Sequence, residues 1–143
     1  MSSFADNNYE ALWQRVMAAF ALSSDSVHGP SHWRRVEKNG LLLAAKSGAR
    51  IDVVRLFAVF HDSKRLNEFT DSEHGPRGAA YAKQLRNVLF QIDDEGFDLL
   101  CEACSVHTVL HHSPDATIGT CLDADRLDLG RVGITPDPEF MST

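Results

Sequence analysis

The sequence predicts an all-α fold, a compact bundle of about six helices. Apolar residues recur at helical spacing in several separate stretches of the 143-residue chain. No internal repeat and no linker rich in glycine, proline or serine divides these stretches, and the 43% hydrophobic content is ordinary for a globular protein. A chain of this length typically builds one hydrophobic core, so we expect residues 1–143 to form a single domain.

The first two helices are predicted at residues 3–22 and 30–47. The first prediction rests on six apolar residues at helical spacing: Tyr9, Leu12, Trp13, Val16, Met17 and Phe20. In the second segment, Pro30 and Ser31 suit a helix start, and His32 follows in the first turn. Gly48 is a suitable C-cap after Ser47.

The third predicted helix is unusually apolar, with Asp52 as a candidate cap at its start. Only Arg55 interrupts the run VVRLFAVF, so we expect this helix to be central and buried on most sides. The Val and Phe content also suits a β-strand, but the helical segments on both sides favour a helix. Three more helices are expected at 74–91, 94–112 and 119–130, after a polar loop at 64–72. The proline-rich tail should not extend the last of them.

The overall charge excludes several classes of function. A net charge of −6 and a pI near 5.5 argue against nonspecific binding to nucleic acid or to an anionic membrane. No apolar run approaches the roughly 20 residues that span a bilayer, and the polar N-terminus does not resemble a signal peptide. Three cysteines cannot all pair within the chain, so we expect reduced thiols and a cytoplasmic location.

The most informative pair in the chain is His61-Asp62, which closes the apolar third helix. A buried charge at this point is costly unless something compensates it, and a divalent metal ion would do so. His32 and Asp125 are the other candidate ligands, and the four supply nitrogen and oxygen donors suited to a catalytic metal with open positions. The alternative interpretation makes His61 a core residue and Asp62 a cap of the following loop.

Three motifs carry a family resemblance. HGPSHWRRV, FHDSKR and DADRLDLG occur in this order, and they resemble the HD-domain superfamily of metal-dependent phosphohydrolases over about residues 28–134. The resemblance implies that His32, His61, Asp62 and Asp125 bind the first metal. In DADRLD the matching carboxylate is Asp125, so we interpret the neighbouring Asp123 and Asp128 as a helix cap and a surface charge.

Two further histidines suggest a second metal site. Some members of the family hold two metals and use two extra histidines between the His-Asp pair and the last Asp; His74 and His107 stand in that order. Asp62 would then bridge the metals. His74 has two alternative roles, because it could accept a substrate phosphate or cap its own helix.

Three residues are candidates for direct contact with a substrate. His28 could lean over the site from its loop, although a solvent-exposed loop histidine is an equal alternative. Lys64 and Arg65 follow the His-Asp pair, where fixed cations could meet a phosphoryl oxygen. Some relatives place a lysine where Arg65 stands here, so the roles of Lys64 and Arg65 stay open, and both could be solvated loop charges.

The resemblance implies a metal-dependent phosphohydrolase, a phosphomonoesterase or phosphodiesterase, that acts on a small phosphate ester or nucleotide through metal-activated water. The ligand set suits one or two ions of manganese, iron, zinc or nickel, and suits magnesium less because of the imidazoles. The alternatives are a di-iron oxygenase of the same fold and a non-catalytic sensor that binds metal and nucleotide. The expected partner is a small phosphorylated molecule, with no nucleic-acid surface and no membrane, and a homodimer is predicted.

Overall fold

The computed structural model describes residues 8–68, 71–110 and 112–128, and within them it confirms the all-α prediction. These residues form six helices in the order α1 (Tyr9–Ala19), α2 (Pro30–Ser47), α3 (Ile51–Phe60), α4 (His74–Leu85), α5 (Asp94–Val106) and α6 (Ala116–Arg126). Across these residues the β-structure is one isolated bridge between Arg86 and Phe90. None of the described helices is both long and apolar enough to cross a bilayer. The end of the motif region, 129–134, lies outside the described residues.

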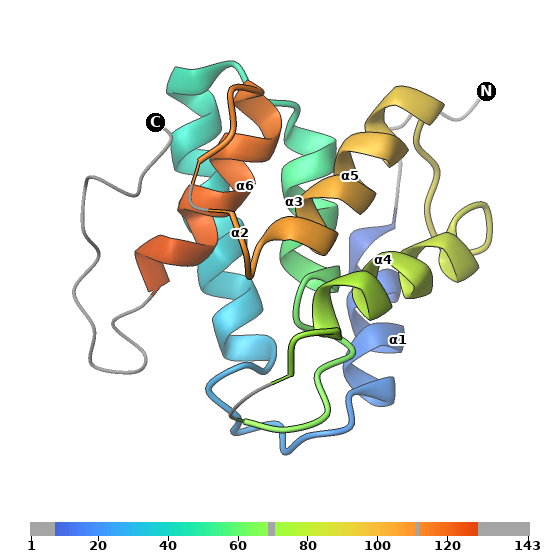
Figure 1. Cartoon of the computed structure of the whole chain (residues 1–143). Helices are drawn as coiled ribbons and strands as arrows, with labels where there is room; N and C mark the ends of the chain where they lie inside the picture. The colour runs from blue at the N-terminus through green and yellow to red at the C-terminus, as the bar shows by residue number, and fades with distance from the viewer. Residues whose placement is uncertain (1–7, 69–70, 111, 129–143) are drawn as a thin grey trace.

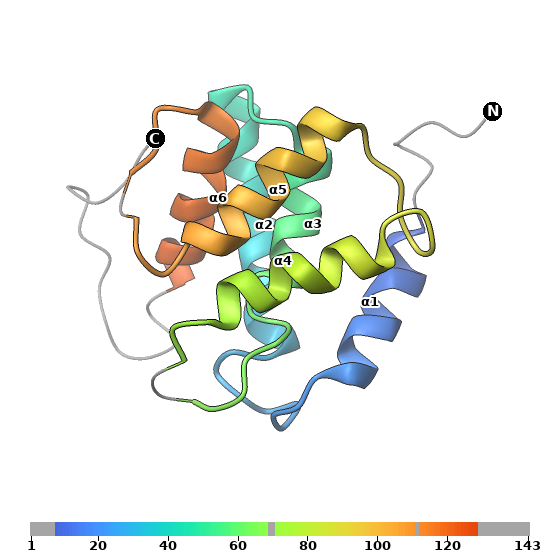
Figure 2. The same cartoon turned by 45° about the vertical axis from the view of Figure 1, so that its right-hand side comes forward.

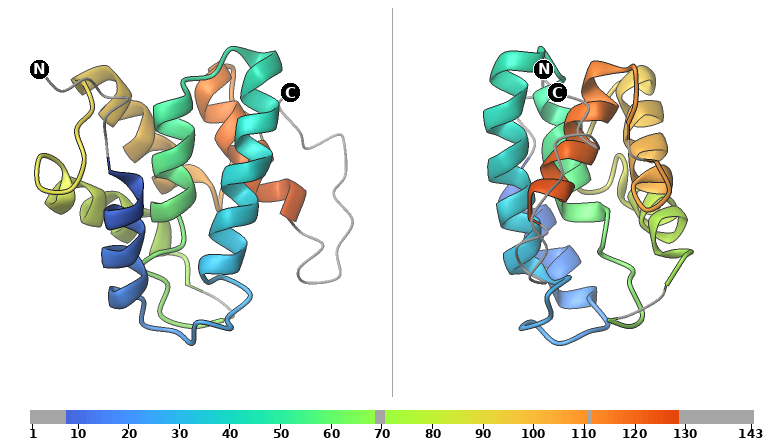
Figure 3. Two further views of the ribbon diagram at one scale, coloured as in Figure 1. Left: turned by 180° about the vertical axis from the view of Figure 1, so that it is seen from behind. Right: turned by 60° about the vertical axis from the view of Figure 1, so that its left-hand side comes forward.

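The helices form two layers. In Figure 1, α2, α3 and α6 stand side by side, and Figure 2 shows α4 and α5 lying obliquely in front of α3. The right-hand view of Figure 3 places α6 between α2 and α5, and the left-hand view shows α1 standing beside α3 from behind. Helix α2 therefore packs on both α3 and α6, and α4 packs mainly on α5.

Helix α3 is the centre of the core, as its apolar run predicts. Seven of its ten residues are buried: Val53, Val54, Leu56, Phe57, Ala58, Val59 and Phe60. Arg55 faces α1, where its guanidinium lies 3.8 Å from the ring centroid of Tyr9. The cap prediction for this helix was wrong, because Arg50 occupies the N-cap position and Asp52 lies in the first turn, where it pairs with Arg50 at 2.7 Å.

Predicted ends of α1, α4, α5 and α6 were wrong by several residues, and the predicted first start at residue 3 and last end at residue 130 lie outside the described residues. Helix α1 ends at Ala19 instead of residue 22. Helix α4 ends at Leu85 instead of residue 91, and Asn87 turns the chain with a left-handed φ of 67°. Helix α5 ends at Val106 instead of residue 112. Helix α6 begins at Ala116 instead of residue 119, because the Asp115 carboxylate accepts hydrogen bonds from the first free N–H groups.

Two glycines bring α4 close to its neighbours. A Cβ at Gly75 would lie 2.4 Å from the carbonyl oxygen of Cys104 on α5, and a Cβ at Gly78 would lie 2.5 Å from that of Phe60 on α3. The two glycines are one helical turn apart, so they share one face of α4. This close backbone contact sets the position of His74 at the start of the helix.

Candidate metal centre

The candidate ligands all lie at or near helix ends, and their ligand atoms converge in two adjoining clusters. His32 is in the first turn of α2, and His74 is the first residue of α4. The other ligands follow or close a helix: His61 and Asp62 after α3, His107 after α5, and Asp125 in the last turn of α6. Ligands that lie far apart in the sequence are brought together in this way.

The first cluster contains the four residues that the sequence motifs single out. One ligand atom from each of His32, His61, Asp62 and Asp125 lies within 4.8 Å of all the others. The Nε2 atoms of His32 and His61 are 3.0 Å apart, and Asp125 Oδ1 lies 3.0 Å from the former and 3.3 Å from the latter. Both imidazoles are fully buried, so their placement is set by core packing.

The second cluster shares a carboxylate with the first. Asp62, His74 and His107 also bring one ligand atom each within 4.8 Å of the others. Asp62 Oδ1 lies 2.9 Å from Nε2 of His74 and 3.4 Å from Nε2 of His107, whereas Oδ2 lies 3.3 Å from Nε2 of His32. The two oxygens of Asp62 therefore face different clusters.

Backbone carbonyls fix the orientation of two of the imidazoles. Nδ1 of His61 lies 3.0 Å from the carbonyl oxygen of Phe57 and 3.1 Å from that of Ala58, and Nδ1 of His107 lies 2.7 Å from that of Cys104. A carbonyl oxygen only accepts, so Nδ1 carries the proton in both rings. The lone pair is left on Nε2, which faces the cluster.

The other two imidazoles, those of His74 and His32, are also oriented by a hydrogen bond from Nδ1, so that Nε2 faces the cluster. His74 Nδ1 donates to the backbone carbonyl of Asp71, and His32 Nδ1 donates to Oδ2 of Asp128 at 2.7 Å. The Nε2 atoms of His74 and His107 are 3.0 Å apart, like those of the first pair. Two lone pairs at this distance repel each other unless a proton or a metal ion lies between them.

Burial and charge act against each other in the first cluster. Burial lowers the pKa of His61. Burial also acts to lower the pKa of His32, but hydrogen bonds to Asp125, Asp128 and Asp62 outweigh it and raise that pKa to about 10. Burial acts to raise the pKa values of Asp62 and Asp125, but the surrounding imidazoles hold both well below the usual range. The site thus keeps two carboxylates ionised in a buried setting, which favours a cation.

Unpartnered atoms support the fit of a metal ion. Among the described residues, His28 Nδ1 is buried without a hydrogen-bond partner, and Asp125 Oδ1 faces only the Nε2 atoms of His32 and His61 among the cluster imidazoles. The Asp125 side chain is 19% exposed, which makes it the most open of the first four ligands. Four donors in one cluster and three in the other would leave open positions on divalent ions.

His28 lies over the clusters, so the alternative of a solvent-exposed histidine was wrong. The residue is 8% exposed, and its Nε2 lies 3.1 Å from the carbonyl oxygen of Glu68, to which it donates. The unprotonated Nδ1 then lies 3.6 Å from Asp62 Oδ2. His28 therefore lies at the edge of the site with Nδ1 directed toward Asp62.

The two cations after the His-Asp pair differ in position. Arg65 is buried, with Nη1 lying 3.2 and 3.3 Å from the two ring nitrogens of His74. The Lys64 ammonium lies 3.9 Å from the ring centroid of Tyr81, on α4. The structure therefore brings Arg65 to the second cluster and directs Lys64 to a cation–π contact.

The interpretations of Asp123 and Asp128 were wrong. Asp128 is buried at 8% exposure and accepts hydrogen bonds from His32 and from Arg35, so it is not a surface charge. Asp123 lies fully buried inside α6, whose N-cap is Asp115. One sequence signal pointed to Asp128: it follows Asp125 by three residues, the spacing that puts helical side chains on one face.

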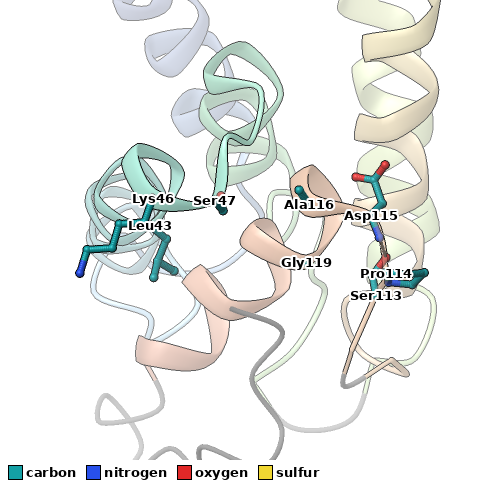
Figure 4. A pocket seen from close by; sticks show the side chains of 8 residues that line it. All are labelled: Leu43, Lys46, Ser47, Ser113, Pro114, Asp115, Ala116 and Gly119. Atoms are coloured by element: carbon teal, nitrogen blue, oxygen red, sulfur yellow. Dashed lines mark hydrogen bonds between the residues drawn. The ribbon is translucent and has the colours of Figure 1, made fainter.

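A separate cavity lies at the opposite ends of α2 and α6. It has a volume of about 600 Å³ and is lined by Leu43, Lys46, Ser47, Ser113, Pro114, Asp115, Ala116 and Gly119. Figure 4 shows three of these side chains on α2 and the others along the segment that enters α6. Leu43 follows His32 by eleven residues and Gly119 precedes Asp125 by six, so about 16 Å of α2 and about 9 Å of α6 separate this cavity from the clusters.

The fold and the paired clusters define an all-helical protein with a candidate metal centre, and comparison with known proteins agrees. The chain is similar to a crystal structure described as a predicted HD superfamily hydrolase from an uncultured Thermotogales bacterium. The two share 27% sequence identity with a TM-score of 0.72, over 86% of this chain and 69% of the other. No protein-family model and no curated protein matches the chain.

This match confirms the resemblance that the sequence motifs indicate, and the chain has the fold of the HD superfamily. The match also agrees with the buried His/Asp groups, which could hold metal ions.

Proposed function

We propose that this protein is a metal-dependent phosphohydrolase that acts on a small phosphate ester or a nucleotide. The observation that carries the proposal is the convergence of four imidazole Nε2 atoms and two carboxylates, with Asp62 common to both groups. The printed description of the Thermotogales relative as a predicted hydrolase supports the same class of reaction.

Different residues of the chain would bind the metal ions, transfer a proton and orient the phosphoryl group. His32, His61, Asp62 and Asp125 would hold one divalent ion, and Asp62, His74 and His107 a second. The chemistry that such ions supply is activation of a water molecule and neutralisation of phosphoryl charge. His28 Nδ1, 3.6 Å from Asp62 Oδ2, would carry a proton to the leaving oxygen. The Arg65 guanidinium would orient a phosphoryl oxygen beside the second cluster.

The donor set also bears on metal identity. Four imidazoles and two carboxylates suit manganese, iron, zinc or nickel, and suit magnesium less, because magnesium prefers an all-oxygen environment. The same shared-carboxylate arrangement suits a pair of irons, so oxygen-dependent cleavage of a substrate is the second candidate function. The oxygenase would be favoured if the purified protein is coloured, consumes oxygen when substrate is added and has no phosphatase activity.

The test begins with elemental analysis of freshly purified protein, followed by a screen of phosphate esters with several divalent metals. The matched variants are His61→Ala and Asp62→Ala, with Glu102→Ala as the control because Glu102 is an exposed α5 residue. We expect Asp62→Ala to lose both ions and His61→Ala to lose the ion of the first cluster, and we expect both variants to lose turnover while the control keeps metal and turnover. Full activity in either site variant would overturn the proposal, and tight ligand binding without turnover would favour a sensor.

A further inference from the structure

Asp128 connects two residues of α2 to the end of α6. Its Oδ2 lies 2.7 Å from His32 Nδ1, and its Oδ1 lies 2.7 Å from Arg35 Nε. His32 and Arg35 are three residues apart, so they lie one turn apart on the same face of α2. The carboxylate thus accepts one hydrogen bond from each and uses both oxygens.

The contact with His32 controls which ring nitrogen faces the cluster. Because Asp128 accepts at Nδ1, a proton stays there, and Nε2, which lies 3.0 Å from both His61 Nε2 and Asp125 Oδ1, is the nitrogen that would bind a metal ion. In His61, His74 and His107, Nδ1 donates instead to a backbone carbonyl oxygen. Of these four imidazoles, His32 is the one whose Nδ1–H donates to a carboxylate.

We propose that Asp128 is a positioning residue for the first metal site, acting through His32. The inference rests on the proposed function, since it presumes that His32 is a ligand. A carboxylate behind a ligating imidazole fixes the ring and makes it a stronger donor, and removing such a partner typically weakens metal binding by about 10- to 100-fold. Arg35 holds the second oxygen, so the carboxylate cannot rotate away from His32.

The contact predicts a selective effect. Asp128 touches His32 and does not form part of the cluster of Asp62, His74 and His107. Its loss should therefore weaken the first site and leave the second unchanged. A residue that only joined α6 to α2 would lower the melting temperature without changing the affinity of the folded protein for metal.

The experiment is calorimetric titration of the metal-free full chain with Mn²⁺, on wild type, Asp128→Ala and Asp128→Asn. Asp93→Ala is the matched control, because Asp93 also pairs with an arginine, Arg50 at 2.8 Å, and caps α5 away from the clusters. Thermal melts of each variant measure the loss of stability separately. Asp128→Asn keeps the size of the side chain and one acceptor oxygen, so it decides the question if Asp128→Ala does not fold.

We expect wild type to bind two ions and Asp128→Ala to lose about 10- to 100-fold in affinity at one of them. The Mn²⁺ affinity of Asp128→Asn should lie between those of wild type and Asp128→Ala. Asp93→Ala should bind Mn²⁺ like wild type despite its lower melting temperature. Unchanged Mn²⁺ affinity in both Asp128 variants would overturn the inference and leave the proposed function standing. Failure of wild type to bind any metal would instead overturn the proposed function.

Discussion

The two clusters around Asp62 are built in different ways. The first is held by the layer of α2, α3 and α6, and its two imidazoles are fully buried in the core. It combines two imidazoles with two carboxylates. The second has two imidazoles and only the shared carboxylate, and the Arg65 guanidinium lies against one of its rings.

This difference implies two sites of unequal strength. An additional carboxylate strengthens the attraction for a divalent ion, whereas a fixed guanidinium 3.2 Å from a ligand ring weakens it. The second cluster also depends on how α4 is seated, since His74 is the first residue of that helix. We therefore expect the first site to fill at lower metal concentration. The second site should be the first to lose its ion when the metal concentration falls or a residue is substituted.

The largest expected effect comes from the residue that both clusters share. Replacing Asp62 with Ala removes the oxygens that face each pair of imidazoles. We expect elemental analysis to find neither ion and the phosphatase rate to fall by at least about 10²- to 10³-fold. One ion retained at full occupancy in this variant would show that the clusters do not depend on a common carboxylate.

Replacing His74 with Ala should separate the two sites. The variant removes a ligand of the second cluster and leaves the four residues of the first untouched. We expect titration with Mn²⁺ to give one ion per chain in place of two, with the tighter affinity preserved. His61→Ala is the counterpart, and it should lose the tighter ion. The comparison fails if both variants lose the same ion.

A change that touches no ligand should also act on the second site. In Gly78→Ala the new Cβ would meet the carbonyl oxygen of Phe60 at 2.5 Å, so α4 must move away from α3. We expect a loss of about 1–3 kcal/mol in stability and a weaker second ion. Gly40→Ala is the matched control, because its Cβ would meet Val54 at 2.4 Å between α2 and α3. It should destabilise the fold without a selective loss of the second ion.

The parts of the site that the sequence predicts are those with a local signature. The apolar run of α3 ends at His61-Asp62, and this pattern alone predicts both the burial of the helix and a compensated charge at its end. The position of Asp128 depends on where the end of α6 lies against α2, which no local pattern contains. The same holds for the close contact at Gly78, because an isolated helical glycine gives no sign of the backbone that faces it.

The wrong helix ends have physical causes as well. Val109 and Leu110 extend the apolar pattern of α5, but none of the described elements covers them, and Val109 is 70% exposed. Apolar spacing predicts a helix where it coincides with a buried face, and here it does not. The start of α6 was readable in principle, since Asp115 after a proline is a common N-cap.

The smallest expected effect concerns the contact between the start of α5 and the start of α3. Asp93, which caps α5, accepts from the N–H of Gly96 and pairs with Arg50, which stands at the N-cap position of α3. These two contacts lower the pKa of the Asp93 carboxyl, with the Gly96 N–H the larger cause. A carboxyl whose pKa is lower in the folded state stabilises the fold above its unfolded pKa, about 3.9, and loses that contribution as pH falls through its folded pKa.

Asp93→Asn should therefore melt below wild type at pH 7, and the gap between their melting temperatures should close as the pH falls below about 4. Melts in the presence of a chelator remove any contribution from bound metal. Asp98→Asn, an exposed α5 substitution that removes neither of these contacts, is the control and should show no such gap. A gap for Asp93→Asn that stays constant down to pH 3 would mean that the cap holds α5 through geometry alone, and that charge contributes nothing to joining α5 to α3.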